Sequence, residues 1–301
     1  MAFLALPPFL SAIIALSLGC FILLKKPRTP VKRTFALLCF ETFYWHACWF
    51  ISYFLHTPTA KDSIVRLAWT IITFIPVTYY EFAVEFLGIE RERKLIRILY
   101  VLAALFLVPL WTTNLFIAGA KDFWFGYYPR VGPLHSLYLL MLFGFLVRAV
   151  MLLMGALKDP QLSDTERNRK RFAFICHAVY FVTASEYLLN YGVPIYPVGA
   201  VTMPAAFLVM VYAITRYQLL DIEVFIKRTL VFAGLVGCVV AVMAFVTQDA
   251  LIRFVNISRW LSNILAAVII AIAYRPVRNW LVNATDKYLF QKKYDYKELL
   301  K

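Results

Sequence analysis

The sequence predicts a polytopic membrane protein that folds as an all-α bundle of about nine transmembrane helices. Apolar residues make up 62% of the 301 residues and charged residues only 16%, and the mean hydropathy is +0.72. A soluble domain is about 45–50% apolar and about 25% charged, whereas a membrane-spanning helix needs roughly 20 mostly apolar residues. The apolar stretches are continuous rather than alternating, which favours helices over a β-barrel. The composition therefore excludes an ordinary soluble domain and a disordered chain.

Nine segments are long and apolar enough to span a membrane. Short loops separate them, so neighbouring helices are expected to pack antiparallel. The predicted spans cover residues 2–24, 34–55, 67–88, 98–119, 133–157, 172–192, 195–215, 229–252 and 260–274.

The Lys and Arg residues predict the orientation of these spans. Of the 31 basic residues, 24 lie in the odd-numbered loops and the C-terminal tail, whereas six lie in the opposite loops. Basic residues are enriched on the cytoplasmic side of membrane proteins. We therefore expect an external N-terminus and a cytoplasmic C-terminus. This orientation accounts for the net charge of +14, so nucleic acid is not expected as a partner.

Catalytic signatures are missing from the sequence. No phosphate-binding GxxxxGK[ST] loop, HExxH, GxSxG or CxxC motif is present, and these motifs carry the common nucleotide, metal and nucleophile chemistries. We expect no catalytic residue, no bound metal and no cofactor. The five cysteines all lie in predicted spans and are interpreted as small apolar filler: Cys20, Cys39, Cys48, Cys176 and Cys238.

Three stretches, taken in their order along the chain, resemble a known family. They are YYPRVGPLHSLYLLMLF at 127–143, the region 169–222 with EYLLNYGVPIYPVGAV and VYAITRYQLLDI, and the tail VNATDKYLFQKKYDYKELL. The chain resembles the N-terminal seven-transmembrane sensor region of bacterial membrane histidine kinases. The resemblance covers roughly residues 5–222.

This resemblance implies an organisation and a role. Residues 1–220 would form the seven-helix sensor module, 221–275 an interfacial link plus a transmembrane hairpin, and 276–301 a cytoplasmic exit helix leading to a GAF, PAS or kinase domain. The module would be a multi-pass protein of the bacterial inner membrane and would pass a stimulus to a cytoplasmic histidine kinase core, in cis or in trans. A homodimer is expected. The phosphoacceptor helix and the ATP-binding region of a kinase core are not in this sequence, so kinase activity is not assigned to it.

Two other functions compete with the sensor interpretation. Ionisable residues within spans would mark a pathway in a secondary transporter or channel, although no inverted repeat with paired broken helices is visible. An integral membrane enzyme acting on lipid would need clustered His or Asp residues at one membrane face, and the four His residues are scattered.

Charged residues at similar depth predict a cluster in the inner half of the bundle. At about 1.5 Å rise per residue, Glu41, Glu81, Arg148 and His177 lie within about 6 Å of one another in depth. Charged groups in spans usually face the bundle and pair, so Arg148 is expected to pair with Glu81 or Glu41, with Glu85 one turn away from Glu81. The alternative is that each group contacts water alone. The predicted cluster comprises Glu41, Glu81, Glu85, Arg148 and His177.

A second group of residues predicts a ligand pocket in the outer half. Thr183, Glu186 and Asn190 lie on one face of the sixth span because their spacing is i, i+3, i+7. An aromatic cleft with a few polar groups is the usual form of a small-molecule site. We expect a small apolar or amphipathic ligand to enter from the outer leaflet, although an interfacial aromatic belt would show the same pattern. The predicted site comprises Trp45, Trp111, Asn114, Thr183, Glu186 and Asn190.

Overall fold

The structure is a computed structural model, and most of the chain up to residue 199 is described. The described residues are 2–24, 28–199, 202–203, 205–206, 209, 231, 234–239, 242–243 and 258–289. The predicted spans 195–215 and 229–252 lie largely outside these residues, as do the link at 216–228 and the tail beyond Leu289.

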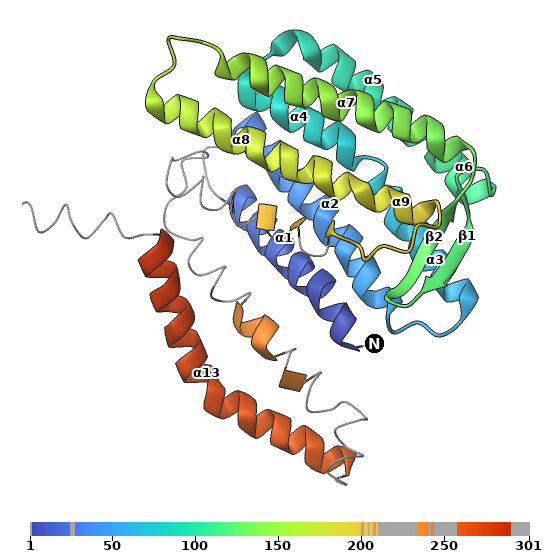
Figure 1. The fold of residues 1–301 in the computed structure, drawn as a ribbon, viewed down its shortest axis with the longest axis vertical. Coiled ribbons are helices and arrows are strands. Elements are labelled where there is room, and N and C mark those ends of the chain that lie inside the picture. The colour runs from blue at the N-terminus through green and yellow to red at the C-terminus, as the bar shows by residue number, and fades with distance from the viewer. Residues whose placement is uncertain are drawn as a thin grey trace, which may run out of the picture.

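The described part is a helical bundle with one β-hairpin at its end (Figure 1). Helix α2 packs against α1, α3 and α4, and α7 packs against α4 and α8. The helices are α1 (Leu6–Leu24), α2 (Pro30–Ser52), α3 (Pro58–Ile72), α4 (Ile75–Leu87), α5 (Arg93–Leu105), α6 (Leu107–Thr112), α7 (Leu134–Leu157), α8 (Asp164–Thr183), α9 (Tyr187–Asn190) and α13 (Arg259–Leu289). Short 3-10 helices precede α1, α5 and α9: η1 (Ala2–Ala5), η2 (Glu90–Glu92) and η3 (Ala184–Glu186).

Six helical segments of the described residues are long and apolar enough to cross a membrane. They are Leu6–Leu24, Pro58–Leu87, Glu90–Thr112, Leu134–Leu157, Asp164–Asn190 and Trp260–Ala284. Each overlaps a predicted span, which confirms a polytopic helical membrane protein. The predicted span 34–55 is the 23-residue helix α2, which is not among the six.

Capping residues explain why two helices begin earlier than hydropathy suggests. Thr57 precedes Pro58, and its hydroxyl accepts a hydrogen bond from the backbone N–H of Ala60 at 3.3 Å. A threonine cap followed by proline is a strong helix start, so α3 begins nine residues before the predicted span at 67. The capping box of Ser163 and Glu166 starts α8 in the same way. The polar first turns of these helices therefore extend beyond the apolar runs.

A β-hairpin replaces the end of the predicted fourth span, so the fold is not purely α-helical. Helix α6 ends at Thr112, and β1 (Ile117–Phe123) pairs antiparallel with β2 (Gly126–Val131). Gly126 has φ 137°, and a Cβ there would lie 3.2 Å from the ring of Tyr53. Glycine is the residue that adopts such a backbone at no steric cost. The turn at Gly126 thus lets the hairpin close onto the end of α2.

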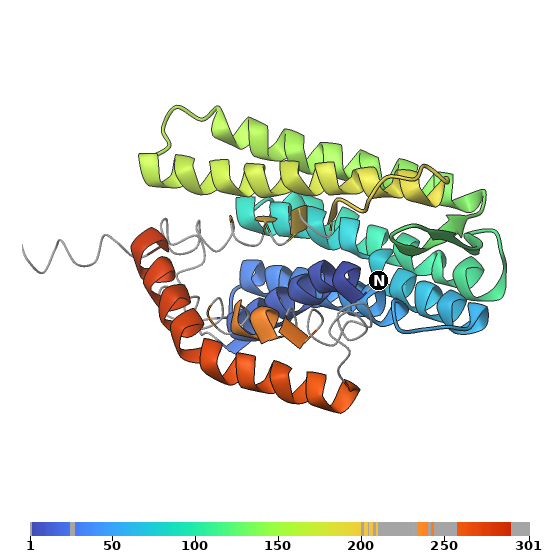
Figure 2. The same cartoon turned by 60° about the horizontal axis from the view of Figure 1, so that its bottom comes forward.

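Helix α13 is longer than the predicted last span. Its 31 residues run without interruption through Pro276 to Leu289, a length of about 46 Å at 1.5 Å per residue. The hydrocarbon core of a bilayer is about 30 Å thick. Figures 1 and 2 show this helix curving along the side of the bundle, and a proline inside a helix is a common cause of a bend. The predicted span 260–274 and the start of the predicted exit helix are therefore one continuous element.

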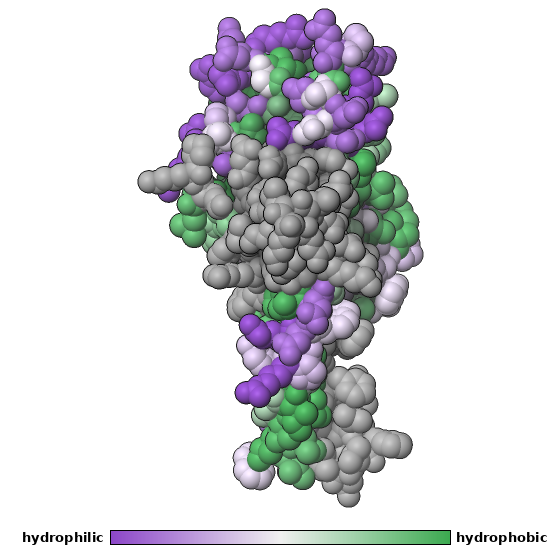
Figure 3. All heavy atoms as spheres, turned by 90° about the vertical axis from the view of Figure 1, so that its left-hand side faces the viewer, coloured by the Kyte–Doolittle hydropathy of each residue, from purple (hydrophilic) through white to green (hydrophobic). Residues whose placement is uncertain are grey.

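One end of the bundle is rich in hydrophilic residues. Figure 3 looks onto the end from which the connection between α7 and α8 projects, and hydrophilic residues gather at the top of that view. Lys158, Asp159, Asp164 and Arg171 are exposed in this connection and in the first turns of α8. The hairpin lies at the opposite end (Figure 1). The predicted charge cluster and the predicted pocket therefore belong to different ends of the molecule.

Candidate ligand cavity and intramembrane charge cluster

A cavity of about 70 Å³ lies between α2, α3, β2 and the segment from α8 to α9. Its walls are mainly apolar and rich in aromatic rings, and most of its non-aromatic polar groups lie on the segment from α8 to α9. A water molecule needs at least about 10–15 Å³ measured in this way, so the volume admits several waters or a small ligand. The aromatic lining residues are Trp45, Trp49, Trp69, Tyr127, Tyr128, Tyr180 and Tyr187, and the polar ones include Ser52, Thr183, Glu186 and Asn190.

Glu186 is the one acidic side chain among the described residues that line this cavity, and only neutral donors contact it there. One carboxylate oxygen accepts a hydrogen bond from the Tyr128 hydroxyl at 2.8 Å, and the other accepts from the backbone N–H of Gly199. A Cβ at Gly199 would collide with this carboxylate, so the close approach requires glycine. Burial and the neighbouring Glu186 raise the pKa of Tyr128 well above its ordinary value. Tyr128 therefore stays a hydrogen-bond donor.

Asn190 and Thr183 complete the polar side of the cavity. Asn190 is 3% exposed, and its side-chain oxygen has no hydrogen-bond partner within the described part of the chain. The Thr183 hydroxyl lies 3.1 Å from the carbonyl of Val179 and 2.7 Å from the hydroxyl of Thr202. The cavity therefore holds one unused acceptor beside a carboxylate.

The structure does not bring all six predicted pocket residues together. Trp45, Thr183, Glu186 and Asn190 line the cavity. Trp111 is half-exposed, and its indole N–H donates to the Thr70 hydroxyl at 3.1 Å. Trp111 and Asn114 are absent from the cavity lining because α6 ends at Thr112 and the chain then turns into the hairpin.

Arg66 explains where Asn114 lies instead. The guanidinium of Arg66 donates to the Asn114 side-chain oxygen at 3.0 Å and to the carbonyl of Ile117 at 3.1 Å. It also donates to the carbonyl of Leu110. The last carbonyls of a helix lack partners within the helix, and a cation satisfies them well. Arg66 therefore joins α3 to the end of α6 and holds Asn114 outside the cavity.

The hairpin forms one wall of the cavity and is bonded to α3 and to the C-terminal end of α2. Tyr127 donates to Asp62 at 2.8 Å, Lys61 pairs with Asp122 at 3.1 Å, and Tyr53 donates to the carbonyl of Phe125 at 2.8 Å. Burial and the Asp62 carboxylate raise the pKa of Tyr127 above its ordinary range. Sequence reasoning missed the hairpin's contribution. The available signal was the aromatic stretch FWFGYYPR with its central glycine, which has the composition of strands around a turn.

In the predicted inner cluster, Arg148 pairs with a different acid from the predicted ones. Its guanidinium forms an ion pair with Glu92 and donates to the Tyr80 hydroxyl at 2.8 Å. Tyr80 in turn donates to the other oxygen of Glu92 at 2.8 Å. The prediction of Glu81 or Glu41 as the partner is therefore wrong. Glu92 lies on η2, between α4 and α5, where the sequence suggested only a cytoplasmic loop.

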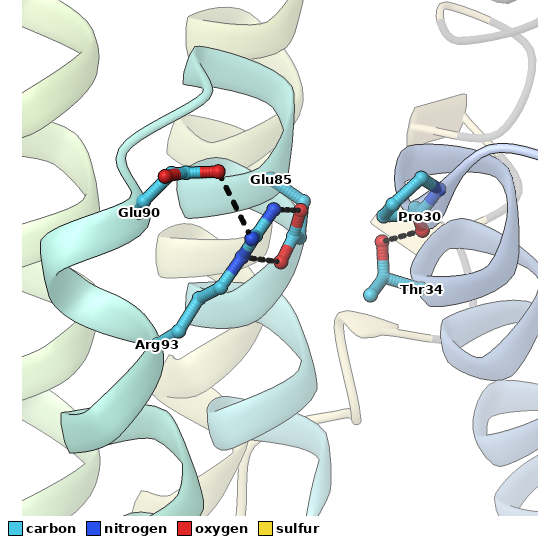
Figure 4. A network of polar contacts seen from close by, with 5 residues as sticks. All are labelled: Pro30, Thr34, Glu85, Glu90 and Arg93. Carbon is cyan, nitrogen blue, oxygen red and sulfur yellow. Dashed lines mark hydrogen bonds and ion pairs between the residues drawn. The ribbon is translucent and has the colours of Figure 1, made fainter.

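Glu85 forms an ion pair with Arg93 at the same end of the bundle. Figure 4 shows Arg93 of α5 reaching the Glu85 carboxylate of α4, with Glu90 nearby. The Arg93 guanidinium donates to both Glu85 oxygens, at 2.9 and 3.1 Å, and to Glu90 at 3.2 Å. Across from this pair, Thr34 in the first turn of α2 donates to the carbonyl of Pro30 at 3.1 Å. The ion pairs of Arg93 with Glu85 and Glu90 thus hold the α4–α5 connection.

Glu41 and Glu81 are linked by a chain of hydroxyl groups. Thr78 donates to Glu41 at 2.8 Å, Tyr100 donates to Glu81 at 2.6 Å, and the two hydroxyls lie 3.0 Å apart. The two hydroxyl groups supply only two hydrogens for these three contacts. A proton on the carboxyl of Glu41 or of Glu81 supplies the third hydrogen bond. His177 takes no part: its ring nitrogens lie 2.8 and 3.3 Å from the carbonyl oxygens of Ala173 and Tyr79.

Metal ligation is not supported by the side chains of the described residues. Among them, no group of three or more His, Cys, Asp or Glu residues is placed to hold a metal ion. A protein metal site usually has at least three such ligands.

Comparison with known proteins gives one match. The model of a family described as the N-terminal 7TM region of histidine kinase matches residues 7–223. No curated protein and no solved structure matches the chain. The matched region includes every element that lines the cavity and both charged groups of the Arg148–Glu92 pair.

Proposed function

Because the chain belongs to the family of N-terminal 7TM regions of histidine kinases, we propose that it is the membrane-embedded input module of a two-component histidine kinase. The members of this family are sensor regions of histidine kinases and not catalytic cores. In this proposal the module lies in the bacterial inner membrane with its N-terminus outside, and it passes a stimulus to a cytoplasmic kinase core in cis or in trans. It acts as a homodimer, since kinase cores work in pairs.

The cavity behind the hairpin carries the proposal of a small-molecule stimulus. A largely apolar site with a few convergent polar groups is the usual form of a ligand pocket. Trp45, Thr183, Glu186 and Asn190 supply this combination. The hairpin that forms one wall is bonded to α2 and α3, and Tyr128 of β2 bonds to the Glu186 carboxylate. A ligand that occupies the cavity therefore contacts elements from both sides of the bundle.

Helix α13 is the proposed output element. It joins the last span to the exit segment without a break. A Cβ on Gly234 would lie 2.9 Å from the Leu281 side chain of α13, and a Cβ on Gly237 would collide with Leu10 of α1. The stretch 234–239 thus contacts both α1 and α13. A rearrangement of the first helices reaches α13 through this close packing.

A cavity-filling substitution tests the proposal without knowledge of the ligand. The chain is joined to the cytoplasmic core of a histidine kinase, and autophosphorylation is measured in membranes. Ala68 lies on α3 and lines the cavity, so the phenyl ring of Ala68→Phe occupies space that a ligand would use. We expect this variant to change the basal autophosphorylation or to abolish its response to the stimulus. The matched control is Ala104→Phe, at an exposed position of α5. Unchanged output and response in Ala68→Phe would contradict the proposal.

A further inference from the structure

We infer that the cavity takes a small ligand with a protonated primary amine on an apolar body. This inference rests on the proposed function, because it names the chemical class that the sensory cavity accepts. Three independent features of the lining support it: the charge of Glu186, the unused acceptor of Asn190, and the aromatic walls.

Glu186 is a buried carboxylate without a cationic neighbour. It is 5% exposed, and its two contacts among the described residues come from the Tyr128 hydroxyl and a backbone N–H. No Lys, Arg or His lines the cavity in the described part of the chain. A buried charge is stabilised by an opposite charge with good hydrogen-bond geometry. An ammonium group in the cavity supplies that charge and still leaves both existing hydrogen bonds in place, because each carboxylate oxygen accepts more than one.

Asn190 adds a requirement for a hydrogen-bond donor. Its side-chain oxygen is buried and unpartnered within the described residues, and the side chain lines the cavity one helical turn beyond Glu186. Leaving a buried acceptor without a partner is unfavourable. A primary ammonium has three N–H donors and can serve Glu186 and Asn190 together. A quaternary ammonium has no donor and leaves Asn190 unsatisfied.

The aromatic walls suit the cation and the apolar body alike. The faces of Trp and Tyr rings attract cations, and Trp45, Trp49, Trp69 and Tyr180 contribute rings to the lining. A carboxylate or phosphate ligand would face Glu186 with no cation to offset the repulsion. The lining therefore selects by the sign of charge, in favour of cations.

Three probes that share one ring and differ in the polar group test this inference. Benzylamine, benzyl alcohol and benzoate are titrated into the 301-residue chain in lipid nanodiscs, and binding is followed by tryptophan fluorescence and by the shift in melting temperature. We expect saturable binding of benzylammonium, at least tenfold tighter than that of benzoate. Because a hydrogen bond to a charged group is lost, Glu186→Gln and Asn190→Leu should each weaken benzylammonium binding about tenfold or more.

Matched variants separate binding from folding. Asn114→Leu makes the same chemical change outside the cavity and should leave the affinity within about twofold. Melting temperatures without ligand show whether Glu186→Gln is folded, and Asn190→Leu tests the same site without touching the Tyr128 contact. Equal affinity for benzoate, absence of saturable benzylammonium binding, or unaltered binding in both variants would overturn the inference.

Different experimental results would contradict the inferred ligand class and the proposed function. If Ala68→Phe changes kinase output while benzylammonium does not bind, the amine inference is wrong and the sensory cavity stands. If Ala68→Phe leaves the output and the response unchanged, the sensory role of the cavity is wrong, whatever the probes bind.

Discussion

The cavity and the inner charge cluster both contain buried carboxylates, but they surround them differently. Glu92 at the inner end is paired with Arg148 and accepts a further bond from Tyr80. Glu186 in the cavity receives only neutral donors from the described residues, and Asn190 beside it has an unused oxygen. A carboxylate with a full set of partners stabilises the contact between helices, whereas one without a counter-charge can still gain from a ligand.

The Glu41–Glu81 chain shows a third way of surrounding carboxylates. Thr78 and Tyr100 supply hydroxyls between the two acids. Neither acid has an ion pair among the described residues. The part of the bundle that holds Arg148 and Glu41 thus combines ion pairs at its edge with a chain of hydroxyl groups deeper in the bundle.

The substitution with the largest expected effect tests whether the cavity wall is also part of the hydrophobic core. Trp69 is 3% exposed and packs against Phe116, His135 and Tyr138. Trp69→Ala should lower the free energy of unfolding by about 3–5 kcal/mol, as large-to-small aromatic substitutions do. Thermal unfolding in nanodiscs measures it, with Trp111→Ala as the half-exposed control. Equal losses in the two variants would show that the cavity wall is not tightly packed.

The next largest effect is expected at the ion pair between Arg148 and Glu92. Arg148→Ala removes the guanidinium that donates to Glu92 and to Tyr80, while Tyr80 still donates to Glu92, so stability should fall by about 1.5–3 kcal/mol, a typical value for hydrogen bonds to charged groups. A double-mutant cycle should show coupling between Arg148→Ala and Glu92→Gln. The same cycle with Glu81→Gln should be additive. Coupling to Glu81 instead of Glu92 would restore the partner that depth along the helices suggested.

A smaller effect concerns the hydroxyl chain. Thr78→Val keeps the shape of the side chain but removes the donor to Glu41, and it should cost about 1–2 kcal/mol. Glu41→Gln should cost less, because the amide can donate to Thr78 as a protonated carboxyl would. Denaturant titration of both variants in detergent gives the comparison, with the exposed Thr112→Val as control. A larger loss in Glu41→Gln would mean that the chain needs an ionised Glu41.

The smallest effect lies at the surface of the hairpin. Lys61 pairs with Asp122, whose side chain is 72% exposed. Because surface ion pairs contribute about 0–1 kcal/mol, Lys61→Ala should leave the melting temperature nearly unchanged. Asp62→Asn keeps an acceptor for Tyr127 and serves as the companion variant. A loss in Lys61→Ala comparable with that in Arg148→Ala would remove the distinction between surface and inner ion pairs.

Apolar length and periodicity predicted much of the fold because they report on single helices. The apolar run of α1, the length of α7 and the common face of Thr183, Glu186 and Asn190 all follow from 3.6 residues per turn. These three residues line one cavity, as their spacing indicates, whereas their role in binding a ligand stays a prediction. The early start of α3 at Pro58 could also be predicted from Thr57 and the proline.

Partners across helices could not be predicted in this way. Depth along a helix placed Arg148 beside Glu81, but depth carries no information on which neighbour a side chain faces. The pair with Glu92 depends on the path of the α4–α5 connection, and Gly88 at φ 68° helps that connection to turn. The end of α6 at Thr112 similarly depends on Arg66, which bonds to carbonyls from a distant helix.

The amino-acid sequence by itself determined that this is a multi-pass helical protein with the N-terminal 7TM region of a histidine kinase, because composition, apolar length and motif order are local properties of the chain. The tertiary structure decided that four of the six predicted pocket residues share a cavity, that a hairpin forms one wall of it, and that Glu186 receives only neutral donors from the described residues. These features depend on contacts between residues distant in the sequence, such as Tyr53 and Phe125, which are 72 positions apart. Such contacts form only when the helices have packed, so no local pattern contains them.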